Sequence, residues 1–113
     1  MNALRLADLS APLAALLVLG TEFAHLPAPA IHISEIFPER LELAFHHDDF
    51  GAFEAWREAL DISPEGIVHR VQGDGPTAVR IVHGTVAGAD VRLVGFAPIP
   101  ALVPVGAGSG AAG

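Results

Sequence analysis

The chain has 113 residues, of which 51% are hydrophobic and 17% charged, and its formal net charge is −7. This length supports one hydrophobic core, and the composition is too apolar for an intrinsically disordered protein. The absence of cysteine excludes a disulfide framework, a thiolate nucleophile and cysteine-ligated zinc. Nucleic-acid binding depends on neutralising phosphates, so the acidic balance predicts no nucleic-acid partner.

The first element of the chain contains an apolar run at residues 11–19 that is too short to span a membrane. This run could belong to a signal peptide, with residues 28–30 as a small-residue cleavage site. We prefer an amphipathic helix, with Asp8 or Ser10 as its N-cap and Pro12 in its first turn, and we expect no membrane partner. The side chains that pack inward would be Leu13, Leu16, Leu17 and Phe23.

The next segment alternates apolar and polar residues, which predicts two half-buried strands joined by a hairpin. The alternating apolar residues are Ile31, Ile33, Leu41, Leu43 and Phe45. A two-residue loop at 38–39 would put the isoleucines on the face opposite the other three. A three-residue loop at 38–40 pairs Phe37 with Leu41 and gathers the large apolar residues on one face, so we prefer it. The side chains pointing away from the core would then be His32, Ser34, Glu42 and His46.

A helical period follows over residues 50–60, where one face carries Phe50, Phe53, Trp56 and Leu60. On the same helix, Glu54, Arg57 and Glu58 have the spacing of a solvated face with one modest ion pair. The two glutamates could also form a carboxylate pair for acid–base catalysis, but that chemistry needs a pocket that the sequence does not show.

The run His46-His47-Asp48-Asp49 precedes this helix and has two interpretations. Asp48 or Asp49 can cap the helix, and both carboxylates complement the positive end of its dipole. The alternative is a metal site, but adjacent strand residues point to opposite faces, so His46 and His47 cannot easily share one ion. We favour capping and expect neither a metal nor a cofactor.

The second half predicts three strands at residues 66–72, 77–86 and 90–99, separated by turns at 73–76 and 87–89. Asp74 between two glycines does not form a phosphate loop, because the P-loop spacing is absent and a strand follows. Both faces of these strands are apolar. One face would carry Val79, Ile81, Val94 and Phe96, and the other Ile67, Val71, Val82, Val91 and Leu93.

These elements predict an α+β fold in the order α-β-β-α-β-β-β, with a mainly antiparallel five-stranded sheet and two helices on one face. We expect a single domain at residues 1–99 and a flexible tail, rich in proline, glycine and alanine, at residues 100–113. Two helices can cover only one face of such a sheet, so either a second chain or the chain itself must cover the other.

A resemblance rests on residues 26–60, LPAPAIHISEIFPERLELAFHHDDFGAFEAWREAL, and more weakly on HRVQGDG and VRLVGFAPIP. This part of the chain, roughly residues 8 to 99, resembles short uncharacterised proteins of actinomycetes, some encoded near phage-like or integrative elements. The resemblance carries no activity, cofactor or catalytic residue. It implies an intracellular, cytoplasmic bacterial protein, with the role of an accessory or regulatory factor of a mobile element.

Two classes of function remain open. The favoured class is a non-catalytic interaction or regulatory protein, acting as a homodimer or as an adaptor for an unidentified protein, with the face carrying Val82 and Leu93 at the contact. The alternative is a small-ligand-binding protein or enzyme, because arginine can clamp an anion and histidine can shuttle protons. Its contacts would come from the late strands, at His69, Arg80, His83 and Arg92, which otherwise read as exposed strand positions that protect an edge. No catalytic residue is assigned.

Overall fold

The computed structural model describes residues 3–46, 49–72 and 76–99. Its two α-helices and five strands follow the predicted order, which confirms the α+β class. The helices are α1 (Ser10–Glu22) and α2 (Gly51–Ala59), with 3-10 turns at Leu6–Leu9 and Pro64–Gly66. The strands are β1 (Ala30–His32), β2 (Arg40–His46), β3 (Val68–Gln72), β4 (Thr77–Val86) and β5 (Ala89–Pro98).

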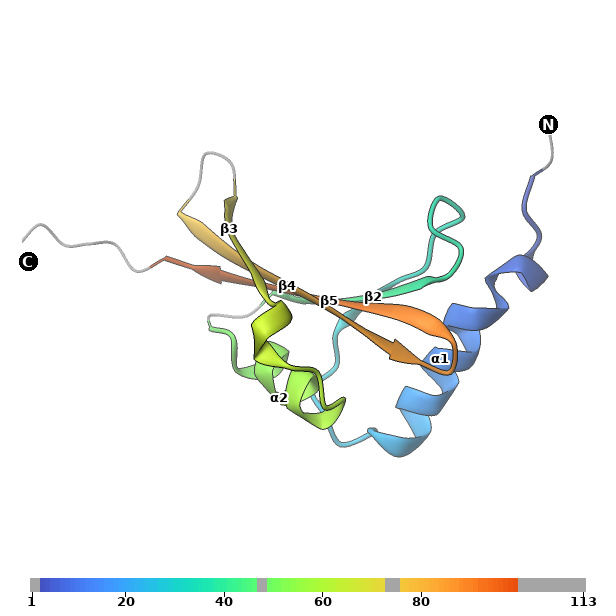
Figure 1. The fold of residues 1–113 in the computed structure, drawn as a ribbon, viewed down its shortest axis with the longest axis horizontal. Coiled ribbons are helices and arrows are strands. Elements are labelled where there is room, and N and C mark those ends of the chain that lie inside the picture. Colours follow the sequence, from blue (N-terminus) through green and yellow to red (C-terminus); the bar gives the residue numbers. More distant parts are fainter. Residues whose placement is uncertain (1–2, 47–48, 73–75, 100–113) are drawn as a thin grey trace, which may run out of the picture.

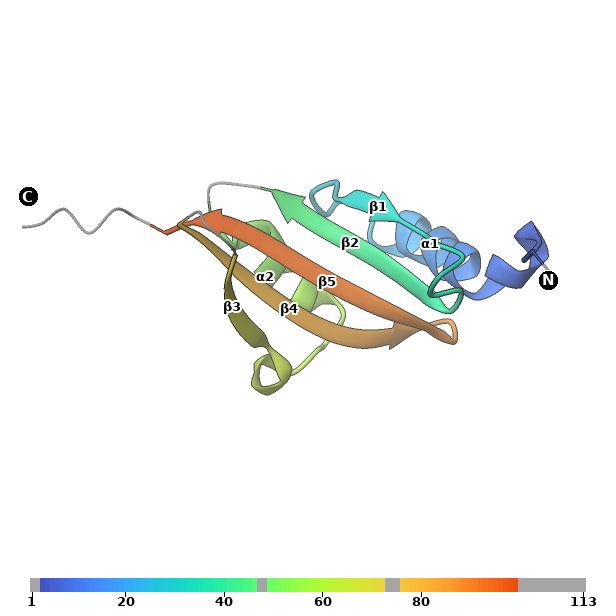
Figure 2. The same ribbon diagram turned by 90° about the horizontal axis from the view of Figure 1, so that it is seen from above.

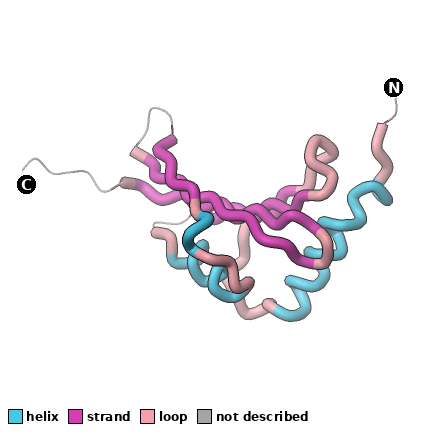
Figure 3. Tube along the Cα trace, in the orientation of Figure 1, coloured by secondary structure: helices cyan, strands magenta, loops and turns pink. Residues whose placement is uncertain are grey.

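The strands form one sheet in the order β1-β2-β5-β4-β3, and only β2 and β5 run parallel. Figure 2 shows β5 in the middle of the sheet, between β2 and β4. Both helices lie on the same face of the sheet, as predicted (Figure 1), and the tube in Figure 3 shows them on one side of the strands. The opposite face carries no described helix and is called the uncovered face below.

The core lies between the two helices and the sheet. The central strands contribute Leu43 and Leu93, which lie opposite each other in the parallel β2–β5 pair, and the helices contribute Leu19 and Phe53. Gly95 on β5 allows this packing, since a Cβ atom there would lie 3.1 Å from the Cβ atom of Phe53. The helical face predicted for α2 is confirmed, because Phe53 and Trp56 are buried and Phe50 and Leu60 pack against the core.

The prediction for α1 is partly wrong. Leu16 and Phe23 pack against the core, but Leu13 and Leu17 remain 39% and 72% exposed. The buried side chains are instead the smaller Pro12 and Ala15, together with Leu19. The chain has no charged residue between Asp8 and Glu22, so its pattern could not indicate which side of this helix faces the sheet. The predicted caps are also wrong, because the N-cap is Leu9 and Asp8 instead accepts a hydrogen bond from the amide of Arg5.

The predicted hairpin has the correct faces but the wrong register. Ile31 lies opposite Leu43, and the predicted pairing of Phe37 with Leu41 does not form. The connection between β1 and β2 is seven residues long, at 33–39. Phe37 lies in this connection, and the centre of its ring is 4.1 Å from the guanidinium carbon of Arg40. The register differs by an even number of residues, so the side chains that remain in β1 and β2 keep their predicted faces.

The β4–β5 hairpin is tighter than predicted. Val86 pairs with Ala89, so the turn contains only Ala87 and Gly88. Both turn residues have positive φ, at 50° and 83°, as a type I′ turn requires. Within the described ranges, no helix has the length and hydropathy needed to cross a bilayer. The predicted tail at residues 100–113 and most of the predicted turn at 73–76 lie outside the described residues.

Candidate functional site

The two residues predicted at an interface lie in the core of the monomer. Val82 and Leu93 face each other across β4 and β5, and their exposed fractions are only 1% and 0%. The helices of the same chain cover the face that carries them, so this face cannot meet a second chain without unfolding. The prediction of Val82 and Leu93 as contacts is therefore wrong. Because both sheet faces are apolar in the sequence, the pattern could not indicate which face the helices cover.

The four predicted ligand contacts do not form one site. His69 lies opposite Arg80 on the face that the helices occupy, whereas His83 lies opposite Arg92 on the uncovered face. Arg80 packs its guanidinium 4.1 Å from the centre of the Phe50 ring. The two predicted arginines thus point to opposite sides of the sheet, and the arrangement expected of a shared anion clamp is absent from the described residues.

The uncovered face instead carries a polar cluster whose charges are paired with one another. Arg92 donates from Nη1 to Glu42 Oε1 at 2.5 Å, and Arg40 donates from Nε to Asp90 Oδ2 at 3.2 Å. His83 Nδ1 lies 2.9 Å from the other oxygen of Asp90. Each of these arginines already has a carboxylate partner on the neighbouring strand, so an anionic ligand would have to displace it.

On the uncovered face, the apolar side chains are largely shielded from solvent by neighbouring side chains of the same face. His46 and Phe96 stack with ring centres 4.5 Å apart and planes 4° from parallel. Ala44 and Val94, which lie opposite each other in the next row, are buried although no described helix covers them. This face therefore offers much less exposed apolar surface than the sequence pattern suggested.

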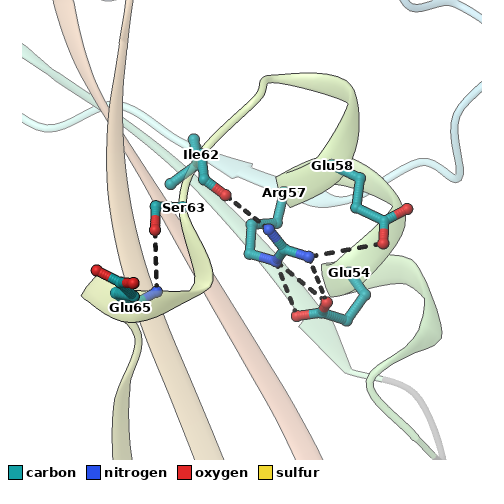
Figure 4. Close-up of polar contacts among 6 residues, drawn as sticks. All are labelled: Glu54, Arg57, Glu58, Ile62, Ser63 and Glu65. Atoms are coloured by element: carbon teal, nitrogen blue, oxygen red, sulfur yellow. Dashed lines mark hydrogen bonds and ion pairs between the residues drawn. The ribbon is translucent and has the colours of Figure 1, made fainter.

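The carboxylates of α2 form a structural cluster around Arg57 (Figure 4). Arg57 is only 8% exposed, which corrects the prediction of a solvated face. Its Nη2 atom donates to Glu54 at 2.8 Å, its Nε atom contacts both Glu54 oxygens at 3.1 Å, and its Nη1 atom donates to the Ile62 carbonyl at 2.6 Å. Glu58 lies 3.6 Å from Nη2.

Arg57 also fixes the protonation states in this cluster. Its hydrogen bonds lower the pKa of Glu54, against the opposing effect of burial, and the same bonds raise the pKa of Arg57. Both groups are therefore held in their charged forms. A general acid would need a carboxyl with a raised pKa, so the lowered pKa of Glu54 does not suit it to that role.

The predicted cap of α2 is wrong at Asp49, because the N-cap is Phe50, which has no side-chain cap. Asp49 lies one residue earlier, and its Oδ1 atom accepts a hydrogen bond from the amide of Gly51, the first residue of the helix, at 2.8 Å. His47 and Asp48, the other members of the possible metal site, lie outside the described residues. Elsewhere in the described part of the chain, no group of three or more histidine, aspartate or glutamate side chains could hold a metal ion.

Two exposed apolar side chains lie together on α1. Leu13 and Leu17 are four residues apart and therefore lie on one side of the helix, which we call the outer face of α1. The helix also buries Ala15 and Leu19 on its opposite side, so it is apolar on both sides. Sequence reasoning missed this face, although the signal was present in the absence of any charge between residues 9 and 21.

Comparison with models of protein families, with curated proteins and with solved structures found no match for this chain. Function must therefore be inferred from the chain's own residues.

Proposed function

We propose that the protein is a non-catalytic interaction protein that acts as a homodimer, and that the outer face of α1 is its contact surface. The observation that carries this proposal is the 72% exposure of Leu17 on a helix that is already packed on its other side. A helix that is hydrophobic all round is normally buried all round. In the proposed homodimer, a second chain covers the outer face of α1.

The charge distribution favours a second copy as the partner. The outer face of α1 is uncharged, whereas the whole chain carries a formal charge of −7. A basic partner would be recognised through acidic side chains, and the contact surface contains none. Two copies can instead pack α1 against α1 around a twofold axis, so that Leu13 and Leu17 of one chain meet the same residues of the other.

The size of this surface predicts a dimer of moderate affinity. Stable interfaces bury about 800 Å² on each partner, and a helix of 13 residues covers only part of that area. Leu6, in the 3-10 turn before α1, is also 73% exposed. We therefore expect reversible dimerisation that depends on protein concentration.

Sedimentation velocity on the full chain tests the proposal. The parent should sediment as a dimer well above micromolar concentration, and Leu13→Glu with Leu17→Glu should give a folded monomer, because a charge buried in the contact would lack a partner. Ile36→Glu and Val71→Glu are matched controls, since Ile36 and Val71 are 74% and 66% exposed and lie elsewhere. Both controls should remain dimeric.

Three results would contradict the proposal. One is a monomeric parent at the highest concentration, which would leave the outer face of α1 for a different protein, as in an adaptor. The second is a dimer that survives the double leucine substitution. The third is dissociation by Val71→Glu alone, which would place the contact at the exposed edge strand β3 instead. Circular dichroism of each variant establishes that the helices are retained.

We also infer an intracellular, cytoplasmic setting and a role as an accessory or regulatory factor of a mobile element. The support is the resemblance of residues 26–60 to short actinomycete proteins, together with the acidic, cysteine-free composition. Fractionation of an actinomycete host that produces the tagged chain would test the compartment. Recovery in the culture medium or in the membrane fraction would contradict this setting.

A further inference from the structure

An apolar pocket of about 250 Å³ lies on the helix side of the sheet, beside the short edge strand β1. It is bounded by α1, by the connector from α1 to β1, by the sheet and by α2. We call it the α1 pocket, and its main lining residues are Leu16, Gly20, Pro27, Pro29, Leu43 and Trp56. Among the described residues that line it, none has a charged side chain, and Trp56 is the only one whose side chain contains a nitrogen or oxygen atom.

Three features keep this pocket open. Gly20 contributes no side chain, and a Cβ atom at that position would meet nothing within 4 Å. Pro27 and Pro29 fix the backbone of the connector that forms one wall. The indole of Trp56 is held by a 2.8 Å hydrogen bond from Nε1 to the carbonyl of Pro27, which ties the connector to α2. The prolines and this hydrogen bond therefore hold the walls of the pocket in place.

The lining determines which molecules can enter. The one side-chain donor among the described lining residues, the Trp56 indole, is already bonded, and prolines have no amide hydrogen to offer. An ionised group would lose its hydration without gaining a partner. An apolar protein cavity of about 150 Å³ accepts benzene, so a pocket of 250 Å³ accommodates a somewhat larger apolar body.

We propose that the α1 pocket binds a small uncharged apolar molecule, with a body of one or two rings or a compact branched hydrocarbon. Ile31 lies at the edge of the pocket and is 48% exposed, which places the entrance beside β1. Neither Leu13 nor Leu17 lines the pocket, so this proposal does not rest on the proposed homodimer.

Trp56 provides a direct reporter, because it is the only tryptophan in the chain and lines the pocket. We would titrate the full chain with iodobenzene, an uncharged ring whose iodine quenches tryptophan fluorescence on contact. The expected result is saturable quenching. The matched probe 4-iodobenzoate carries the same iodine with a negative charge and should give only weak quenching that rises linearly with concentration.

Two substitutions at one position complete the test. Gly20→Leu should fill the pocket and weaken iodobenzene binding by about tenfold or more, whereas Gly20→Ala adds one methyl group and should retain binding. Methyl NMR of the parent should show the largest shifts for Leu16, Leu43 and Ile31, and this measurement does not depend on any variant folding. Linear quenching of the parent, equal saturable binding of the charged probe, or binding unaffected by Gly20→Leu would each overturn the proposal.

Discussion

Arg57 and Glu54 form a two-pronged ion pair in which Nε and Nη2 of the guanidinium both donate to the carboxylate, at 3.1 Å and 2.8 Å. The third nitrogen of Arg57 reaches the carbonyl of Ile62 at 2.6 Å, beyond the end of α2. One side chain thus joins the first turn of the helix to the segment that leaves it. Because burial leaves Arg57 little water as an alternative partner, the pair is more than a surface contact.

This pair predicts how stability depends on pH. The hydrogen bond from Arg57 lowers the pKa of Glu54 in the folded chain, so the unfolded chain binds the proton more readily. The stabilisation is therefore fully present above the ordinary pKa of glutamate, and it is lost as the pH falls through the lowered value.

Glu54→Gln should consequently reduce the free energy of unfolding at pH 7, and the difference from the parent should shrink at about pH 3. Urea melts at both pH values measure this difference. Glu35→Gln serves as the control, since Glu35 is exposed and should change little at either pH. A deficit for Glu54→Gln that is equal at both pH values would contradict the assignment.

Trp56 is predicted to be the largest single contributor to the core. It is 5% exposed, packs against Phe45 with ring centres 6.1 Å apart, and donates to the Pro27 carbonyl. Trp56→Ala should lower the free energy of unfolding by about 3–5 kcal/mol, because it removes both the packing and the hydrogen bond. Trp56→Phe should cost less, since it retains a ring. Urea melts of Trp56→Ala within about 0.5 kcal/mol of the parent would be typical of a surface position and would exclude this role.

The parts of the fold that could be predicted were those set by local periodicity. Alternation assigned Val82 and Leu93 to one face and Ile81 and Val94 to the other, and the strand pairing confirms both assignments. The parallel pairing of β2 with β5 brings together residues 50 apart, such as Glu42 and Arg92, and no local pattern encodes such a contact.

The candidate surfaces were harder to predict, because they depend on which side of each element meets the core. Leu13 and Leu17 read as inward residues because every side of α1 is apolar. Arg57 and Glu54 have the spacing of an ordinary solvated pair, and the Ile62 carbonyl that accepts a hydrogen bond from Arg57 lies after the helix, outside the helical pattern. Which of these side chains are buried depends on tertiary contacts rather than on sequence spacing.

The β4–β5 turn offers a stabilising substitution. Ala87 has a φ of 50°, a region that costs a residue with a Cβ atom about 1–2 kcal/mol. Ala87→Asn would create Asn-Gly, the preferred pair for this turn, and should raise the free energy of unfolding by about 0.5–1 kcal/mol. Gly88→Ala is the opposing control, because φ is 83° there and the change should destabilise. Thermal melts that rank the two variants in the reverse order would contradict the turn assignment.

The acidic balance predicts that the protein does not bind duplex DNA appreciably at physiological salt. Of the six basic residues, Arg40, Arg57 and Arg92 already pair with carboxylates, which leaves few positive charges for phosphates. Fluorescence anisotropy with a labelled duplex should show no binding at micromolar protein. Tight binding that weakens steeply with salt would show that a local basic patch overrides the net charge.

Salt should strengthen the proposed homodimer, whereas it weakens binding to DNA. Two chains of formal charge −7 repel each other, while the outer face of α1 contributes no charged group to the contact. Raising the salt from about 0.01 M to about 1 M shortens the screening length from about 30 Å to about 3 Å, so the repulsion should fade and the dimer should tighten. Sedimentation at several salt concentrations measures this trend.

A charge-reduced control sharpens the comparison. Glu35→Gln with Glu65→Gln removes two exposed carboxylates outside α1 and should make dimerisation tighter at low salt and less dependent on salt. Dissociation of the parent dimer at high salt would instead indicate a contact held by ion pairs. Salt screens the attraction between charged groups, and the outer face of α1 has none. The surface to test next would then be the polar cluster of Arg40, Asp90 and His83 on the uncovered face.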